Sequence, residues 1–196
     1  MTSRVLSVRC SGRRKVLCAL CAAVPGAVAL RSGSAGAAEA PIEQVKAAYL
    51  LKFPSFVDWP ASAFPSATSP FVIAVSGAGD VYAALCELAP GNPMHGRPVE
   101  VLRLQSPEPT TTTHLVFVGS DRSAQLPAWI AAYATRPVVV VADTVGGLES
   151  GAALNFVEVG NQLRFEASPG AAEKSGLRLS SRLLGVAERV LKGESS

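Results

Sequence analysis

The sequence predicts an α/β fold: a three-layer sandwich with a mostly parallel central sheet, helices on both faces and a C-terminal antiparallel hairpin. Short apolar runs, typical of strands covered on both faces, alternate with segments of helical periodicity. This alternation is typical of a parallel sheet between two helical layers. Near the C-terminus, two strand-like segments flank Gly160-Asn161, a pair typical of a tight hairpin turn.

The first 37 residues have the organisation of an export signal rather than of a folded element. A basic segment ending in Arg13-Arg14-Lys15 precedes an apolar stretch over 16–30, which is shorter than the ~20 apolar residues needed to span a bilayer. Small residues around Ala37 then offer a cleavage site. We expect residues 1–37 to be removed as a signal peptide, of the Sec or the twin-arginine type, with an uncleaved membrane anchor as the alternative.

Residues 38–196 are enough for one domain with a real core. All 15 acidic residues but only 12 of the 18 basic ones lie in this part, so its net charge is −3 although the whole chain carries +3. Without a basic cluster to neutralise phosphates, the composition excludes nucleic-acid binding as the main function. Three of the four cysteines lie in the leader, and we expect the remaining one, Cys86, to be buried on the inner face of a helix.

The mature part opens with a helix over 42–52, which Pro54 should end or kink. Pro- and Ser-rich residues at 60–70 predict a loop. The next expected elements are a strand at 71–75, a helix at 80–88, a more exposed strand at 99–104, a buried strand at 115–118, a helix at 125–134 and a third buried strand at 138–142.

The C-terminal part differs from this alternating pattern. The expected hairpin pairs 153–159 with 162–166, and a short helix should run from Ser168 to Gly176. Ser180 has the side chain of a helix cap, and an apolar stripe follows it. We therefore expect a final helix that Gly193 ends, with its apolar face formed by Leu183, Leu184, Ala187, Val190 and Leu191.

Motifs for nucleotide binding and catalysis are incomplete. Gly77 and Gly79 follow a buried strand as in a phosphate-binding loop, but Tyr82 occupies the place of the third glycine, which favours an ordinary tight turn. The two histidines, His95 and His114, have no partners in a recognisable hydrolase or zinc pattern. The sequence therefore predicts a protein that is not an enzyme and that holds no cofactor or metal.

Two long motifs carry a family resemblance. VKAAYLLKFPSFVDWP (45–60) and LNFVEVGNQLRFEASPGAAEKSGLRLSSRLLGVAERV (154–190) resemble the opening and closing signatures of the YfiR-type periplasmic regulators. Between them, GRPVEV (96–101) and HLVFV (114–118) follow in the expected order. The resemblance covers about 42–191, essentially the whole of the mature part.

This resemblance implies a periplasmic α/β protein that represses an inner-membrane diguanylate cyclase. Such a regulator binds the periplasmic sensory part of the cyclase, a GGDEF protein, so that less cyclic di-GMP is made and biofilm formation is restrained. The family also implies a homodimer and a redox-responsive disulfide. Ala74 and Thr113 stand where many members have cysteines, so redox control through that pair is not expected in this chain.

A partner-binding surface is expected from residues in the two signatures. An aromatic pair beyond the helix break at Pro54 would be a natural anchor, whereas aromatic residues before it also fit core packing. The charged candidates fit either a polar rim or an ordinary solvated face. The candidates are Tyr49, Phe53, Phe56, Trp59, Arg164, Glu166, Arg178 and Arg182.

A small-molecule binding protein is the alternative from another functional class. Ligands of open α/β sheets bind in the crevice at the carboxyl ends of the strands. In this sequence that crevice would lie near Gly77, Gly119 and Asp143.

Overall fold

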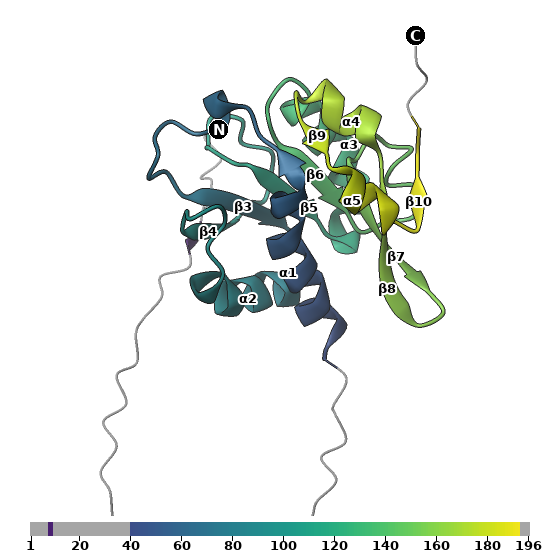
Figure 1. Cartoon of the computed structure of the whole chain (residues 1–196). Helices are drawn as coiled ribbons and strands as arrows, with labels where there is room; N and C mark the ends of the chain where they lie inside the picture. Colours follow the sequence, from purple (N-terminus) through teal and green to yellow (C-terminus); the bar gives the residue numbers. More distant parts are fainter. Residues whose placement is uncertain (1–7, 10–39, 193–196) are drawn as a thin grey trace, which may run out of the picture.

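A mixed sheet forms the centre of the computed structural model, which describes residues 8–9 and 40–192 (Figure 1). The five strands in its middle are parallel, and the antiparallel pairings lie toward its two edges. Apart from Val8–Arg9, the predicted signal peptide lies outside the described residues. In spatial order the strands are β1 (Val8–Arg9), β4 (Val99–Arg103), β3 (Phe71–Ser76), β5 (Leu115–Val118), β6 (Val139–Ala142), β7 (Leu154–Val159), β8 (Gln162–Ala167) and β10 (Arg189–Val190).

Helices cover both faces of this sheet, as predicted (Figure 1). We call the face covered by α1 (Ile42–Lys52) and α2 (Gly79–Leu88) the front face, and the face covered by α3 (Leu126–Tyr133) the back face. No helix within 40–192 is long and apolar enough to cross a membrane. The shorter helices are η1 (Phe53–Phe56), η2 (Ala61–Ala63), η3 (Ala89–Gly91), η4 (Ser120–Gln125), α4 (Pro169–Lys174) and α5 (Ser181–Gly185).

Each face of the sheet has its own hydrophobic core. Successive strand residues point to opposite faces, so Ile73 and Val75 of β3 join the front core whereas Ala74 joins the back core. Every residue of β3, β5 and β6 is buried, which explains why these strands read as continuous apolar runs. Cys86 on α2, expected in the core, is half-buried and packs against the front core.

A second, two-stranded sheet joins the two ends of the mature chain. The chain leaves α1 through η1, whose second residue is Pro54, and then forms β2 (Val57–Asp58). This strand pairs antiparallel with β9 (Arg178–Leu179). Residues about 120 positions apart in the sequence are therefore neighbours in space.

The hairpin of β7 and β8 forms as the sequence predicts. Gly160 and Asn161 have φ angles of 55° and 62°, and such a pair of left-handed residues makes the tight turn whose twist matches the two strands. Ser168 and Ser180 also behave as predicted, because each side chain accepts a hydrogen bond from a backbone N–H in the first turn of the following helix.

The predicted final helix is wrong beyond its first turns. Helix α5 ends at Gly185, and the following residues form β10, which pairs parallel with β8. The backbone N–H groups of Glu188 and Leu191 donate to the carbonyls of Phe165 and Ala167, both at 2.8 Å. The open edge of β8 thus provides hydrogen-bond partners for these N–H groups. Continuing α5 would instead place Gly185 inside a helix, at a cost of about 1 kcal/mol.

Candidate partner-binding surface

The aromatic residues of the opening motif divide into two clusters. The first consists of Tyr49, Phe53, Phe156 and Phe165, with ring centroids of neighbouring members 5.0–6.0 Å apart. It joins α1 to the hairpin on the front face. Phe53 is only 2% exposed and Tyr49 is half-buried. Of these two partner-binding candidates, Phe53 therefore lies in the core and is not displayed.

The second cluster joins the segment after η1 to the sheet. Trp59 packs edge-on against Phe71 and His114, at centroid distances of 5.3 and 6.0 Å. The indole N–H of Trp59 also donates to the carbonyl of Pro54. Phe64 and Phe71 each stack against the ring of His114, at centroid distances of 4.6 and 4.9 Å. These contacts fix the position of Trp59 while leaving it partly exposed.

His114 holds the second cluster to the sheet through both ring nitrogens. Its Nδ1 accepts a hydrogen bond from the backbone N–H of Val72 at 3.0 Å, so the proton lies on Nε2, which faces the carbonyl of Ala63 at 3.1 Å. Burial lowers the pKa of His114, the bond to Ala63 opposes this, and the charge of Arg97 lowers the pKa further. A neutral, structural histidine results.

The β2–β9 sheet displays charge on one side and packs on the other. Val57 and Leu179, which face each other, are buried, whereas Asp58 and Arg178, which also face each other, are exposed. Neither charged residue takes part in an ion pair with any residue of the described chain.

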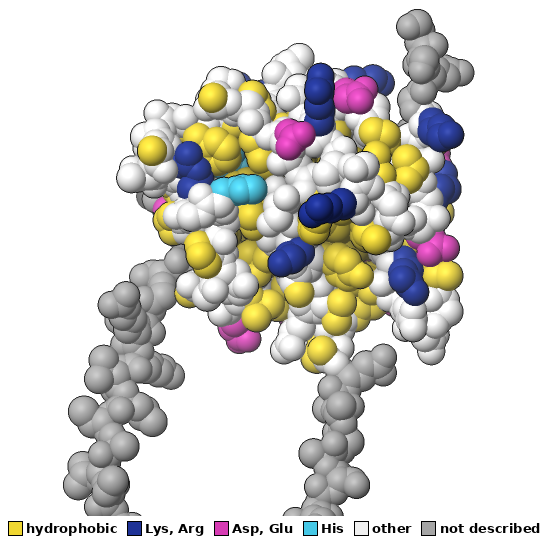
Figure 2. All heavy atoms as spheres, viewed as in Figure 1, with side chains coloured by type: hydrophobic (Ala, Val, Ile, Leu, Met, Phe, Trp, Pro, Cys, Tyr) yellow, Lys and Arg dark blue, Asp and Glu magenta, His cyan; other side chains and the backbone are white. Residues whose placement is uncertain are grey.

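Phe56 and Arg182 lie beside this sheet. The carbonyl of Phe56 accepts from the N–H of Ser180 at 2.9 Å, which places α5 against η1. Phe56 is half-buried and Arg182 is exposed on α5. We call the surface formed by Phe56, Asp58, Trp59, Arg178 and Arg182 the junction surface. In Figure 2, on the same side of the molecule, Lys and Arg side chains border apolar surface over α1 and α5.

The remaining two candidates lie on the hairpin and differ in their exposure and in their hydrogen bonds. Arg164 is exposed and donates to Gln162 at 2.8 Å. The carboxylate of Glu166 accepts from Arg189 at 2.6 Å and from Asn155 at 3.2 Å, and its side chain is 12% exposed. Glu166 therefore fastens β10 to the sheet, and the structure does not place it with the junction surface.

Side chains of the protein fill the crevice at the carboxyl ends of the central strands. The carboxylate of Asp121 accepts from the N–H of Ala78 at 2.9 Å and occupies the space beside Gly77 and Gly119, where an added Cβ would collide with it. At the next strand end, Lys46 forms a 2.8 Å ion pair with Asp143. The glycine loop is thus a tight turn closed by an internal carboxylate, which takes the place that a bound phosphate would need.

The positions of the implied disulfide do not face each other. Ala74 lies opposite Val116 in the pairing of β3 with β5, so Thr113 is three residues away, about 10 Å along the strand. A disulfide joins Cα atoms about 4.4–6.8 Å apart. In this fold, cysteines at these two positions would not pair. The described residues also contain no group of three or more His, Cys, Asp or Glu side chains that could hold a metal ion.

A family model described as YfiR/HmsC-like matches residues 43–188, which is most of the chain and includes the opening motif and all but the last two residues of the closing one. The chain belongs to the YfiR/HmsC-like family. This family is regulatory rather than catalytic. A crystal structure of a conserved domain protein from Vibrio cholerae is similar at 13% sequence identity with a TM-score of 0.44. The likeness covers 61% of this chain and 54% of that one, so this chain spans about half of the solved protein. No curated protein matches.

Sequence reasoning missed Asp58, Asp121 and the bridging role of His114. Asp58 lies within the quoted opening motif, but its exposure opposite Arg178 depends on a two-residue strand pairing. Asp121 lies 43 residues from the N–H that it binds. For His114, the signal was its position directly before a fully apolar strand, which indicates burial but not the two bonds.

Proposed function

We propose that this protein is exported to the periplasm with removal of residues 1–37, and that it there binds and represses the periplasmic sensory part of an inner-membrane diguanylate cyclase. Its output is then a lower level of cyclic di-GMP. Family membership supports the regulatory role, and the exported location rests on the leader-like organisation of the first 37 residues.

One observation of the structure supports a binding surface at the junction of the two motifs. The opening and closing motifs lie at opposite ends of the mature chain, yet β2 and β9 join them into one small sheet. This sheet presents Asp58 and Arg178 outward, beside the half-buried aromatic residues Phe56 and Trp59. Partly exposed aromatic side chains held by packing, with arginine nearby, are typical of the anchors that dominate protein interfaces.

Repression by such a surface is a population shift. The protein must bind the inactive state of the cyclase more tightly than the active state, and the difference in affinity sets how far the equilibrium moves. We propose further that the regulator acts as a homodimer, which would place two junction surfaces against a dimeric membrane partner.

The geometry favours this function over small-molecule binding at the carboxyl ends of the strands. A ligand there would have to displace Asp121 from the Ala78 N–H and to separate Lys46 from Asp143. Both interactions cost energy to break.

Deletion of the gene tests the proposal. Cyclic di-GMP should rise in the deletion strain, and a copy carrying its own leader should restore the low level. A copy that begins at residue 38 should not, because it would remain in the cytoplasm. Removal of the partner cyclase together with the regulator should abolish the rise. An unchanged level in the single deletion, with an intact cyclase present, would contradict the proposal.

A further inference from the structure

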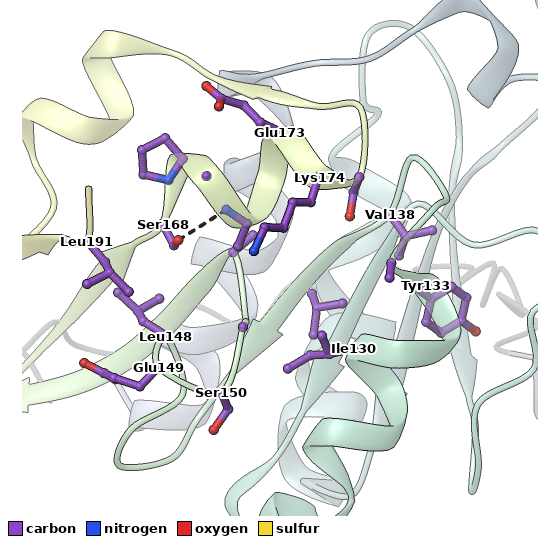
Figure 3. Close-up of a pocket in the computed structure, with 18 of the residues that line it drawn as sticks. Ile130, Tyr133, Val138, Leu148, Glu149, Ser150, Ser168, Glu173, Lys174 and Leu191 are labelled. Carbon is purple, nitrogen blue, oxygen red and sulfur yellow. Dashed lines mark hydrogen bonds between the residues drawn. The ribbon is translucent and has the colours of Figure 1, made fainter. Parts of the chain in front are cut away.

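A large groove that borders α3 of the back face is lined by none of the residues of the junction surface or of the filled crevice. Its volume is about 1180 Å³, and it lies between α3, the start of β6, the loop that precedes β7, and α4 (Figure 3). Leu191 and Lys192, which follow β10, line it as well.

The groove exists because the back layer is incomplete. Helix α3 has only eight residues, about 12 Å, and its buried side chains pack over β5 and β6. Beyond α3, the small residues Gly151 and Ala153 line the groove, and α4 forms its opposite wall. Ile130, Val138, Val140 and Leu148 make the floor and walls apolar.

Two lysines line the groove, Lys174 and Lys192, and neither forms an ion pair within the described chain. Figure 3 shows the side chain of Lys174 reaching from α4 into the groove, whereas the carboxylate of Glu173 points away. Lys174 takes part in none of the ion pairs of the described residues. The acidic residue on the opposite wall, Glu149, is bound to Arg189 at 2.7 Å, and this bond lowers the pKa of Glu149.

We propose that the groove binds a small amphipathic anion, with an apolar body on the floor and an acidic group at the amine of Lys174. Ligand sites typically have volumes of about 300–1,000 Å³ and polar groups that fix orientation. This groove, at about 1180 Å³, is somewhat larger, and it combines an apolar floor with polar groups on its walls. Since the acidic residues at its rim are paired or turned away, an anion is favoured over a cation. This site does not depend on the proposed repressor function.

Calorimetric titration of the protein, purified after secretion with its own leader, tests the site with three probes of equal chain length. Decanoate carries a negative charge, decanol none, and decyltrimethylammonium a positive charge, all used below their micelle-forming range. Decanoate should bind most tightly, because only it can pair with Lys174. Equal binding of the three probes, or no binding of decanoate, would overturn the proposal.

Two variants separate the acidic-group site from the apolar floor. Lys174→Met should lower the affinity for decanoate about tenfold while leaving that for decanol unchanged, since it removes one charge-assisted contact. Lys52→Met, on α1 at the front face, is the matched control and should change neither. Ala171→Trp should fill the groove and remove binding of decanoate and of decanol. Decanoate binding that survives both Lys174→Met and Ala171→Trp would place the ligand elsewhere and contradict the inference.

Discussion

The two faces of the central sheet are covered to different extents. On the front face, α1 and α2 lie side by side, and their side chains close a core that reaches from β4 to β8 (Figure 1). On the back face, the core under α3 is smaller, and the groove lies beside it. Both faces belong to the same strands, so the difference arises from the helices and not from the sheet.

This difference separates two kinds of surface. The helices of the front face pack closely on their core, and this face displays its charged and aromatic side chains where β2 and β9 meet. An incomplete layer leaves apolar floor accessible to a small molecule. Protein binding is therefore expected at the β2–β9 sheet, and ligand binding in the groove between α3 and α4.

Truncating one apolar side chain on each face tests this comparison. Of all the predictions, it should give the largest change in the free energy of unfolding. Phe53→Ala removes a ring from the closed front core and should lower the free energy of unfolding by about 3–5 kcal/mol. Ile130→Ala, at the wall of the groove, should cost only about 1 kcal/mol, because its side chain is already partly in water. Urea unfolding of both variants measures this. Equal losses would mean that the back face is as closed as the front.

Replacing His114, which bridges Val72 and Ala63, should give the next largest change in the free energy of unfolding. His114→Phe keeps the ring stacking but leaves the Val72 N–H and the Ala63 carbonyl without partners, which should cost about 2 kcal/mol or more. Because the pKa of His114 is lowered in the folded state, the unfolded chain binds the proton first as the pH falls. The wild-type protein should therefore be most stable above the ordinary histidine pKa of about 6.5 and lose stability below it.

The free energy of unfolding, measured between pH 5 and pH 7, distinguishes the two histidines. This range is chosen because it includes the usual histidine pKa of about 6.5. His95 is exposed, so His95→Gln should keep the pH dependence of the wild type, and His114→Phe should lose it. A pH dependence that disappears with His95 and persists without His114 would show that the buried bridge is not the titrating group.

The two helix caps give the smallest of the stability effects. Ser168 caps α4 at the groove and Ser180 caps α5 at the junction, each through one hydrogen bond to a backbone N–H. Ser168→Ala and Ser180→Ala should each cost about 1 kcal/mol in thermal or urea unfolding. Ser181→Ala, one residue past the cap and exposed, is the control and should cost nothing measurable. A loss at Ser181 as large as at Ser180 would rule out the capping explanation.

The sequence predicts the strands in the middle of the sheet closely. These strands are buried on both faces, so they appear in the sequence as continuous apolar runs. The expected strands at 71–75, 115–118 and 138–142 agree with β3, β5 and β6 to within one residue at each end. The hairpin was predictable for a local reason as well, since Gly160 and Asn161 both tolerate positive φ.

Features that depend on distant partners were not predictable. The apolar positions of 183–191 fit a helix, but the competing partner is the edge of β8, which only the folded sheet provides. The same holds for the candidate site. Phe53 and Trp59 come from one motif, yet the first is in the core and the second is partly displayed, because η1 turns the chain between them. Two-residue strands such as β2 and β9 have no recognisable sequence signal.

The affinity of the protein for the isolated periplasmic part of its cyclase partner tests the central claim most directly. We expect the wild type to form a complex, and Arg178→Glu with Arg182→Glu to weaken it at least about tenfold, because both charges lie on the junction surface. Arg136→Glu reverses an exposed charge just after α3 and should leave the affinity unchanged. The same affinity for all three proteins, or no complex with the wild type, would contradict the account.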